Sequence, residues 1–107
     1  MPMFDDREKG YEKKFEHDQE LAFKAKARRN MLLGLWAARL LGLAGDDAQT
    51  YAKSIVEIDL QPHGDDIIVE KLTKDFATKG VSIDAHRIRA ELARLAQEAR
   101  KQLRIPG

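Results

Sequence analysis

The sequence contains no cysteine and only three prolines among its 107 residues. Without cysteine the chain can form neither a disulfide framework nor a thiolate metal site. Its composition is therefore compatible with a reducing compartment. The scarcity of proline, with 43% hydrophobic and 35% charged residues, suits a water-soluble helical protein. A chain of this length forms one small domain with a single modest core, which makes a large enzymatic pocket unexpected.

The chain also lacks an excess of either charge, with 19 basic and 18 acidic residues and a net charge of +1. No bulk field therefore drives it onto DNA or anionic lipid, and we expect no nucleic-acid partner. The charge is nevertheless zoned along the chain. Residues 1–20 carry a net −3, residues 21–45 +5, residues 46–84 −5 and residues 85–107 +4. Alternating signs favour attraction between antiparallel neighbours.

A long hydrophobic run is missing as well. The strongest apolar stretch, residues 31–45, contains Arg39 and falls short of the roughly 20 apolar residues that a membrane span requires. The chain opens with an acidic segment rather than the basic one of a signal peptide. We therefore expect a cytoplasmic protein without direct membrane insertion, in which this stretch forms a core helix.

Apolar residues recur at helical spacing through most of the chain, and glycine and proline fall between the periodic segments. The pattern predicts helices over about 20–43, 46–61, 65–79 and 84–104. Gly42 and Gly45 are expected to end the first of these in a left-handed conformation. Short connections make consecutive helices antiparallel, so residues 20–107 are predicted to form an all-α four-helix bundle.

Two features of the first predicted helix point to close packing. Gly34, among leucines and paired alanines, would let a neighbouring helix approach closely. Trp36 is interpreted as a large core anchor because its neighbours are apolar in both directions. An interface hot spot is the alternative for this tryptophan.

Chemistry-bearing groups are sparse. Three Asp-Asp pairs, at 5–6, 46–47 and 65–66, resemble paired carboxylates, but each precedes a candidate helix, where capping accounts for it. Asp46 is expected to cap the second helix, with Gln49 completing a capping-box pattern, and Asp65 is expected to open the third. Asp84 is expected to cap the fourth, with Ile83 and Ile88 as a hydrophobic staple.

The remaining catalytic candidates do not form a site. His17, His63 and His86 are scattered, and none has a second histidine at metal-ligand spacing. No glycine-rich phosphate loop or nucleophile turn is present. We therefore expect no enzyme activity, no metal and no catalytic residue.

Residues 1–19 do not fit the bundle. Phe4, Tyr11 and Phe15 form a narrow apolar seam with Ala22, at spacings of seven, four and seven residues, in a segment otherwise made of charges. Gly10 and like-charged neighbours weaken any isolated helix here. One interpretation is an arm that frays or is disordered when free and becomes helical in a partner's groove. The alternative is a segment that extends the first helix and folds back on the bundle.

One dense basic stretch precedes the apolar run and comprises Lys24, Lys26, Arg28 and Arg29. It is a candidate for holding phosphate from a nucleotide or a nucleic acid, but only Phe23 offers an aromatic ring for base stacking. A solvated helix face, or a patch that matches an acidic partner, is the favoured interpretation.

Several motifs of the N-terminal half resemble one known family. The sequences FDDRE at 4–8, FEHDQEL at 15–21, FK at 23–24, ARRN at 27–30 and LLGLWAA at 32–38 are similar to the bacterial ATP synthase zeta subunit, a family of small inhibitors of the F-type ATPase. The resemblance is dense over about the first 45 residues. Over residues 46–107 it consists mainly of length and helix pattern.

The resemblance implies a four-helix bundle with a mobile N-terminal arm that blocks ATP hydrolysis. The arm would insert as a helix at a catalytic alpha/beta interface near the gamma stalk, stopping rotation in the hydrolysis direction while rotation in the synthesis direction expels it. Its partners would be the alpha, beta and gamma subunits, at the cytoplasmic face of the inner membrane. The candidate partner-binding residues of the arm are Met3, Phe4, Asp5, Arg7, Glu8, Tyr11, Lys14, Phe15 and Asp18.

A second hypothesis treats the protein as a nucleotide-sensing helical bundle. The basic stretch from Lys24 to Arg29 would then contact the phosphates of weakly bound ATP or ADP, and no other cofactor is expected. The two hypotheses are compatible with each other. In either case we expect a monomer when the protein is free.

Overall fold

The computed structural model describes the backbone of residues 2–59 and 61–105, and side chains from residue 17 onward within these ranges. It contains four helices, α1 (Pro2–Leu40), α2 (Gly45–Ile58), α3 (Gly64–Thr78) and α4 (Ala85–Gln102). The described residues include no strand. The prediction of an all-α fold with four helices is therefore confirmed.

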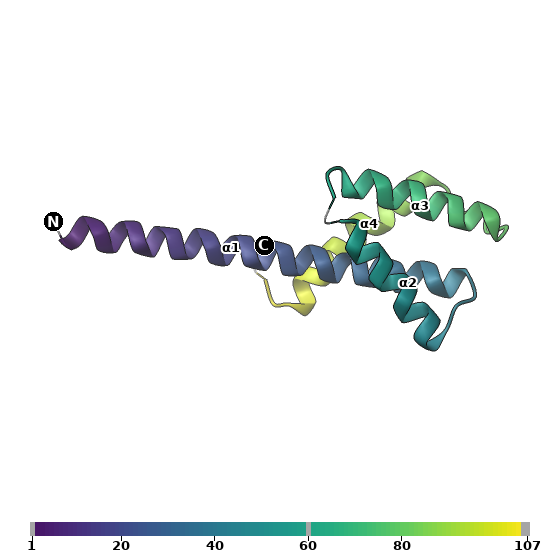
Figure 1. Ribbon diagram of the computed structural model, residues 1–107, viewed down its shortest axis with the longest axis horizontal. Coiled ribbons are helices and arrows are strands. Elements are labelled where there is room, and N and C mark those ends of the chain that lie inside the picture. The colour runs from purple at the N-terminus through teal and green to yellow at the C-terminus, as the bar shows by residue number, and fades with distance from the viewer. Residues whose placement is uncertain (1, 60, 106–107) are drawn as a thin grey trace.

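Helix α1 is the axis of the molecule, and its N-terminal half runs on beyond the other three helices (Figure 1). α2 and α4 pack along its C-terminal half, and α3 packs against α4 and α2. The extents of 66 × 26 × 22 Å follow from this projecting helix. The N-terminal segment thus continues α1 away from the bundle, whereas the folding back considered above is not seen. The expected mobility of the arm falls mainly on residues 1–16, whose side chains lie outside the described part.

The core lies where the four helices meet. Its fully buried members are Leu33 and Ala37 of α1, Ile55 of α2, Ile68, Leu72 and Phe76 of α3, and Ile88 of α4. Trp36 packs against this cluster and meets Phe76 edge-on, with ring centroids 5.8 Å apart and planes at 84°. An edge-to-face pair adds stabilisation beyond the area it buries. Trp36 therefore packs on the core as predicted, but it is only partly buried.

Gly34 permits a close approach between α1 and α2. A Cβ atom at this position would lie 2.5 Å from the Cα atom of Ala52 and 3.0 Å from its Cβ atom. The first of these distances is shorter than any normal carbon–carbon contact, and the obstructing atom belongs to the backbone. The expected role of Gly34 in close helix packing is therefore confirmed.

Three helices end on the same hydrogen-bonded turn, with a left-handed residue just beyond the helix. Gly42 (φ 81°) follows α1 and Gly80 (φ 70°) follows α3, whereas Arg104 (φ 57°) follows α4. In each case the next residue donates its N–H to a carbonyl five residues back, from Leu43 to Ala38, from Val81 to Phe76 and from Ile105 to Arg100, all at 2.8 Å. This is the Schellman motif, which prefers glycine at the left-handed position. The prediction for Gly42 is confirmed.

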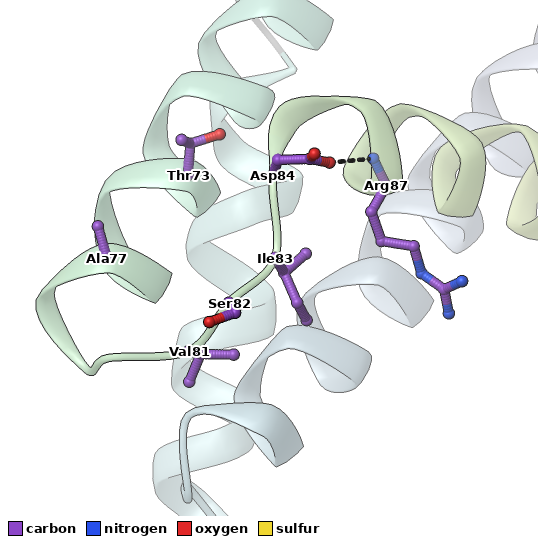
Figure 2. A pocket seen from close by; sticks show the side chains of 7 residues that line it. All are labelled: Thr73, Ala77, Val81, Ser82, Ile83, Asp84 and Arg87. Atoms are coloured by element: carbon purple, nitrogen blue, oxygen red, sulfur yellow. Dashed lines mark hydrogen bonds between the residues drawn. The ribbon is translucent and has the colours of Figure 1, made fainter.

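The predicted N-caps have mixed outcomes. Asp84 caps α4, since its Oδ1 accepts a hydrogen bond from the N–H of Arg87 at 2.9 Å (Figure 2). Ile83 and Ile88 lie in or against the core on either side of this cap, as the staple requires.

The predictions that Asp46 and Asp65 cap their helices are wrong. α2 and α3 begin after Ala44 and His63, and neither makes a side-chain cap. The aspartates lie inside the first turn, where negative charge still complements the helix dipole. The side chains of the pair at 5–6 lie outside the described residues.

Among the described residues, no helix combines the length and apolar character needed to cross a membrane.

Candidate functional site

The candidate arm residues lie on the projecting part of α1. The side chains of Met3, Phe4, Asp5, Arg7, Glu8, Tyr11, Lys14 and Phe15 fall outside the described residues. Asp18 is exposed and borders a hollow of about 300 Å³ between α1 and the end of α4. The other walls of this hollow are Leu21, Ala22, Ala25, Arg100 and Ile105. The hollow therefore marks the point where α1 leaves the bundle.

The basic stretch on α1 is divided among several partners. Lys24 pairs with Glu20 one turn away at 3.2 Å, Lys26 with Asp59 at 3.2 Å, and Arg29 with Asp65 at 2.7 Å. Arg28 is exposed and makes no ion pair with any described residue. Three of the four cations therefore already have carboxylate partners within the chain. No observation favours a phosphate site formed by all four.

The pair between Arg29 and Asp65 ties α1 to the start of α3. Both terminal nitrogens of Arg29 donate to the carboxylate, at 2.7 and 3.4 Å, and its Nε donates to Asn30 at 2.9 Å. The Arg29 side chain is only 13% exposed. Its hydrogen bonds are the main reason that the pKa of Asp65 lies below its ordinary value.

Two further ion pairs act beside this one. Lys26 reaches Asp59 at the end of α2, and Arg89 of α4 reaches Asp66 at 3.0 Å. Acidic residues of the 46–84 zone thus meet basic residues of the zones on either side, as the zoned charge predicts. The particular partners were not foreseen, because the residues of the Arg29–Asp65 pair are 36 positions apart.

A second polar cluster joins α2 to α3. The hydroxyl of Tyr51 donates to Asp75 at 2.6 Å, and the ammonium of Lys71 donates to the same carboxylate oxygen at 3.1 Å. Lys71 also lies 5.2 Å from the centre of the Tyr51 ring. Burial and the neighbouring carboxylate raise the pKa of Tyr51. Helical spacing alone gave no indication of this polar contact of Tyr51.

Glu91 is the one buried acidic residue among the described side chains, at 4% exposure. It pairs with Arg94 on the same helix and more distantly, at 3.7 Å, with Arg87. The hydrogen bond to Glu91 raises the pKa of Arg94. Since both partners neutralise Glu91 on its own helix, the group is structural.

Two of the surface hollows have linings that hold no reactive cluster among the described residues. One of about 600 Å³ lies beside the α3–α4 connection and is lined by Thr73, Ala77, Val81, Ser82, Ile83, Asp84 and Arg87 (Figure 2). The carboxylate of Asp84 in this hollow is engaged in its cap. His17, His63 and His86 are exposed on separate segments. Among the described residues, no group of three His, Asp or Glu side chains lies close enough together to hold a metal ion.

The described side chains thus define a class: a small all-α protein whose polar groups form ion pairs and caps, with its first helix projecting past the bundle. Within this class, the chain belongs to the ATPase inhibitor subunit zeta family, whose model matches residues 1–102. The family is one of inhibitors, so the chain has an inhibitory role toward an ATPase. A search of curated proteins finds no significant match.

Proposed function

We propose that the protein inhibits ATP hydrolysis by the F-type ATP synthase through residues 1–19. In this proposal the segment binds as a helix at a catalytic alpha/beta interface near the gamma stalk. The observation that carries the proposal is the family match, which begins at residue 1 and so includes the whole projecting segment. The protein acts as a regulator without catalytic activity, at the cytoplasmic face of the membrane that holds the enzyme.

The physical basis is the composition of this segment. It offers three aromatic side chains, Phe4, Tyr11 and Phe15, at helical spacing, and most of the rest is charged. The α1 backbone leads away from the other three helices here (Figure 1). A cleft in a partner supplies the apolar surface for these rings, in the manner of an amphipathic helix bound in a groove.

The direction of the block follows from where the helix binds. A helix wedged in an interface that must close during hydrolysis prevents that closure and the rotation coupled to it. Rotation in the opposite sense opens the same interface and releases the helix. The protein therefore acts as a one-way block of rotation, which stops ATP hydrolysis and permits ATP synthesis.

The test is a pair of assays on membrane vesicles that contain the ATP synthase. The full chain is expected to suppress ATP hydrolysis and to leave ATP synthesis under a proton gradient nearly unchanged. Equal suppression of both reactions would contradict the one-way block. If neither reaction is suppressed, the proposed inhibition is contradicted.

Aromatic substitutions identify the residues responsible. Replacing Phe4, Tyr11 and Phe15 together by alanine is expected to weaken inhibition of hydrolysis by at least about a hundredfold, because three buried rings each contribute about 1–3 kcal/mol. Phe23→Ala is the matched control, since Phe23 lies on the same helix, is 63% exposed and is outside the seam. It is expected to inhibit as the unmodified chain does.

A further inference from the structure

The C-terminal end of α4 departs from the pattern set by the other helix ends. α1 and α3 place glycine at the left-handed position of the Schellman motif, but α4 places Arg104 there, at φ 57°. The motif itself is complete, because the N–H of Ile105 donates to Arg100 at 2.8 Å and that of Arg104 donates to Lys101 at 3.1 Å. A side chain in this region is strained, whereas glycine is not. Arginine at this position is therefore less favourable for stability than glycine would be. What arginine provides and glycine does not is the charge of the guanidinium group.

Two more cations accompany Arg104. Arg100 and Lys101 are exposed, and none of the three makes an ion pair with a described residue. The other arginines of α4 behave differently, since Arg87, Arg89 and Arg94 are each paired with a carboxylate. Cations in the last turn complement the helix dipole, which accounts in part for Arg100 and Lys101. The dipole does not account for the strained Arg104 beyond the helix.

These three residues are here called the basic end, and one of them, Arg100, lies beside the point where α1 leaves the bundle. Arg100 and Ile105 form one wall of the hollow whose other wall is Asp18, Leu21, Ala22 and Ala25 of α1. The end of α4 is accordingly drawn beside the middle of α1 (Figure 1), and the two helices pack against each other. Ala22 is also the last member of the seam, seven residues after Phe15.

The seven-residue spacing between Phe15 and Ala22 determines how the bundle is oriented once the arm is bound. This argument rests on the function proposed above. Residues seven apart on a helix lie on nearly the same face. In the proposed complex, residues 4–22 are helical in the partner's cleft. The wall of the cleft that receives Phe15 then lies on the same side of α1 as Ala22, where the end of α4 packs. The basic end then faces the mouth of that cleft.

We propose that Arg100, Lys101 and Arg104 form a second contact with the ATP synthase, on an acidic surface at the mouth of the cleft that receives the arm. Charge complementarity is the argument for this partner, because the three cations are exposed and have no partners among the described side chains. Such a contact steers the arm into the cleft and holds the bundle against the enzyme's outer surface. Its contribution to binding falls as ionic strength rises.

The test measures the concentration for half-inhibition of ATP hydrolysis at low and high ionic strength. The triple charge reversal R100E/K101E/R104E is compared with K53E/K74E/K79E, which reverses three exposed lysines of the α2 and α3 side that make no ion pair with a described residue. At low ionic strength the first variant is expected to need about tenfold more protein and the second less than about twofold more. At high ionic strength the difference narrows. Equal behaviour of the two variants would overturn the proposal.

Arg104→Gly separates binding from folding. It removes the strain of the left-handed arginine, so the thermal midpoint is expected to rise while inhibition at low ionic strength weakens. Unchanged inhibition by this variant would contradict a role for its charge. The unmodified chain in the same assay reports on the proposed function itself. If it inhibits and the basic-end variants match it, only the second contact fails.

Discussion

Asp65 shows how one carboxylate can serve a structure without capping a helix. Its pKa is lowered chiefly by the hydrogen bonds from Arg29. A carboxylate whose pKa is lower in the folded than in the unfolded chain adds stability above the unfolded value of about 3.9. That stability is lost as the pH falls through the folded value. The Arg29–Asp65 pair therefore contributes at neutral pH and not in strong acid.

Asp65→Asn is expected to lower the free energy of unfolding by about 1–2 kcal/mol at pH 7, because it leaves the largely buried Arg29 without a charged partner. Urea denaturation at pH 7 and at pH 3 measures the effect, which should shrink at the lower pH. Asp66→Asn is the control, since the Asp66–Arg89 pair is exposed. It should cost less than about 0.5 kcal/mol. Equal losses from the two variants would contradict the assigned burial.

Gly34→Ala is expected to destabilise the protein by about 1–3 kcal/mol, despite the better helix propensity of alanine. The reason is the backbone of Ala52, 2.5 Å from the position of the new Cβ. Thermal denaturation followed by circular dichroism measures the change. A more stable variant would show that α1 and α2 are farther apart than described here.

At the scale of the helices, the sequence predicted a helix end correctly where the conformation or side chain of a single residue determines that end. Gly42 ends α1 and Asp84 begins α4, and each acts through its own backbone or side chain. Asp46 failed as a cap because α2 begins one residue earlier, after Ala44. α3 begins after His63, which adopts a left-handed conformation (φ 60°) that spacing does not reveal. The existence of the helices and the start of α4 were therefore predictable, but the exact starts of α2 and α3 were not.

Asp84→Ala is expected to lower the free energy of unfolding by about 1 kcal/mol, because the N–H of Arg87 loses its acceptor. Asp46→Ala is the matched control, since α2 has no side-chain cap to lose. It should cost less than about 0.5 kcal/mol. Chemical denaturation of both variants under the same conditions measures the contrast. The reverse order would contradict the cap assignment.

At the scale of the whole molecule, the sequence predicted that oppositely charged segments attract each other, but not which residues form the ion pairs. Zoned charge indicated that residues 46–84 would attract the basic segments on either side, and ion pairs between these zones are present. Pairing Arg29 with Asp65 depends on where the start of α3 lies relative to α1, which is set by long-range contacts. The unpaired cations at the end of α4 were likewise invisible, because they are recognised only once the other arginines have found partners.

The separation of bundle and projecting segment predicts independent stability. The buried hydrophobic residues of the described part begin at Ala25, so a chain lacking residues 1–19 retains the whole core. We expect this truncated chain to unfold cooperatively, with a thermal midpoint within a few degrees of that of the full chain. Calorimetry of both forms measures this. A large drop in the midpoint would mean that the segment stabilises the bundle.

The most direct test of the account is the inhibition of ATP hydrolysis by this same truncated chain. The isolated catalytic head of the ATP synthase is titrated with the full chain and with residues 20–107, each checked for folding beforehand. The account predicts that the full chain inhibits and that the folded, truncated chain does not. Inhibition by residues 20–107 at similar concentrations would contradict the assignment of the blocking element to the N-terminal segment.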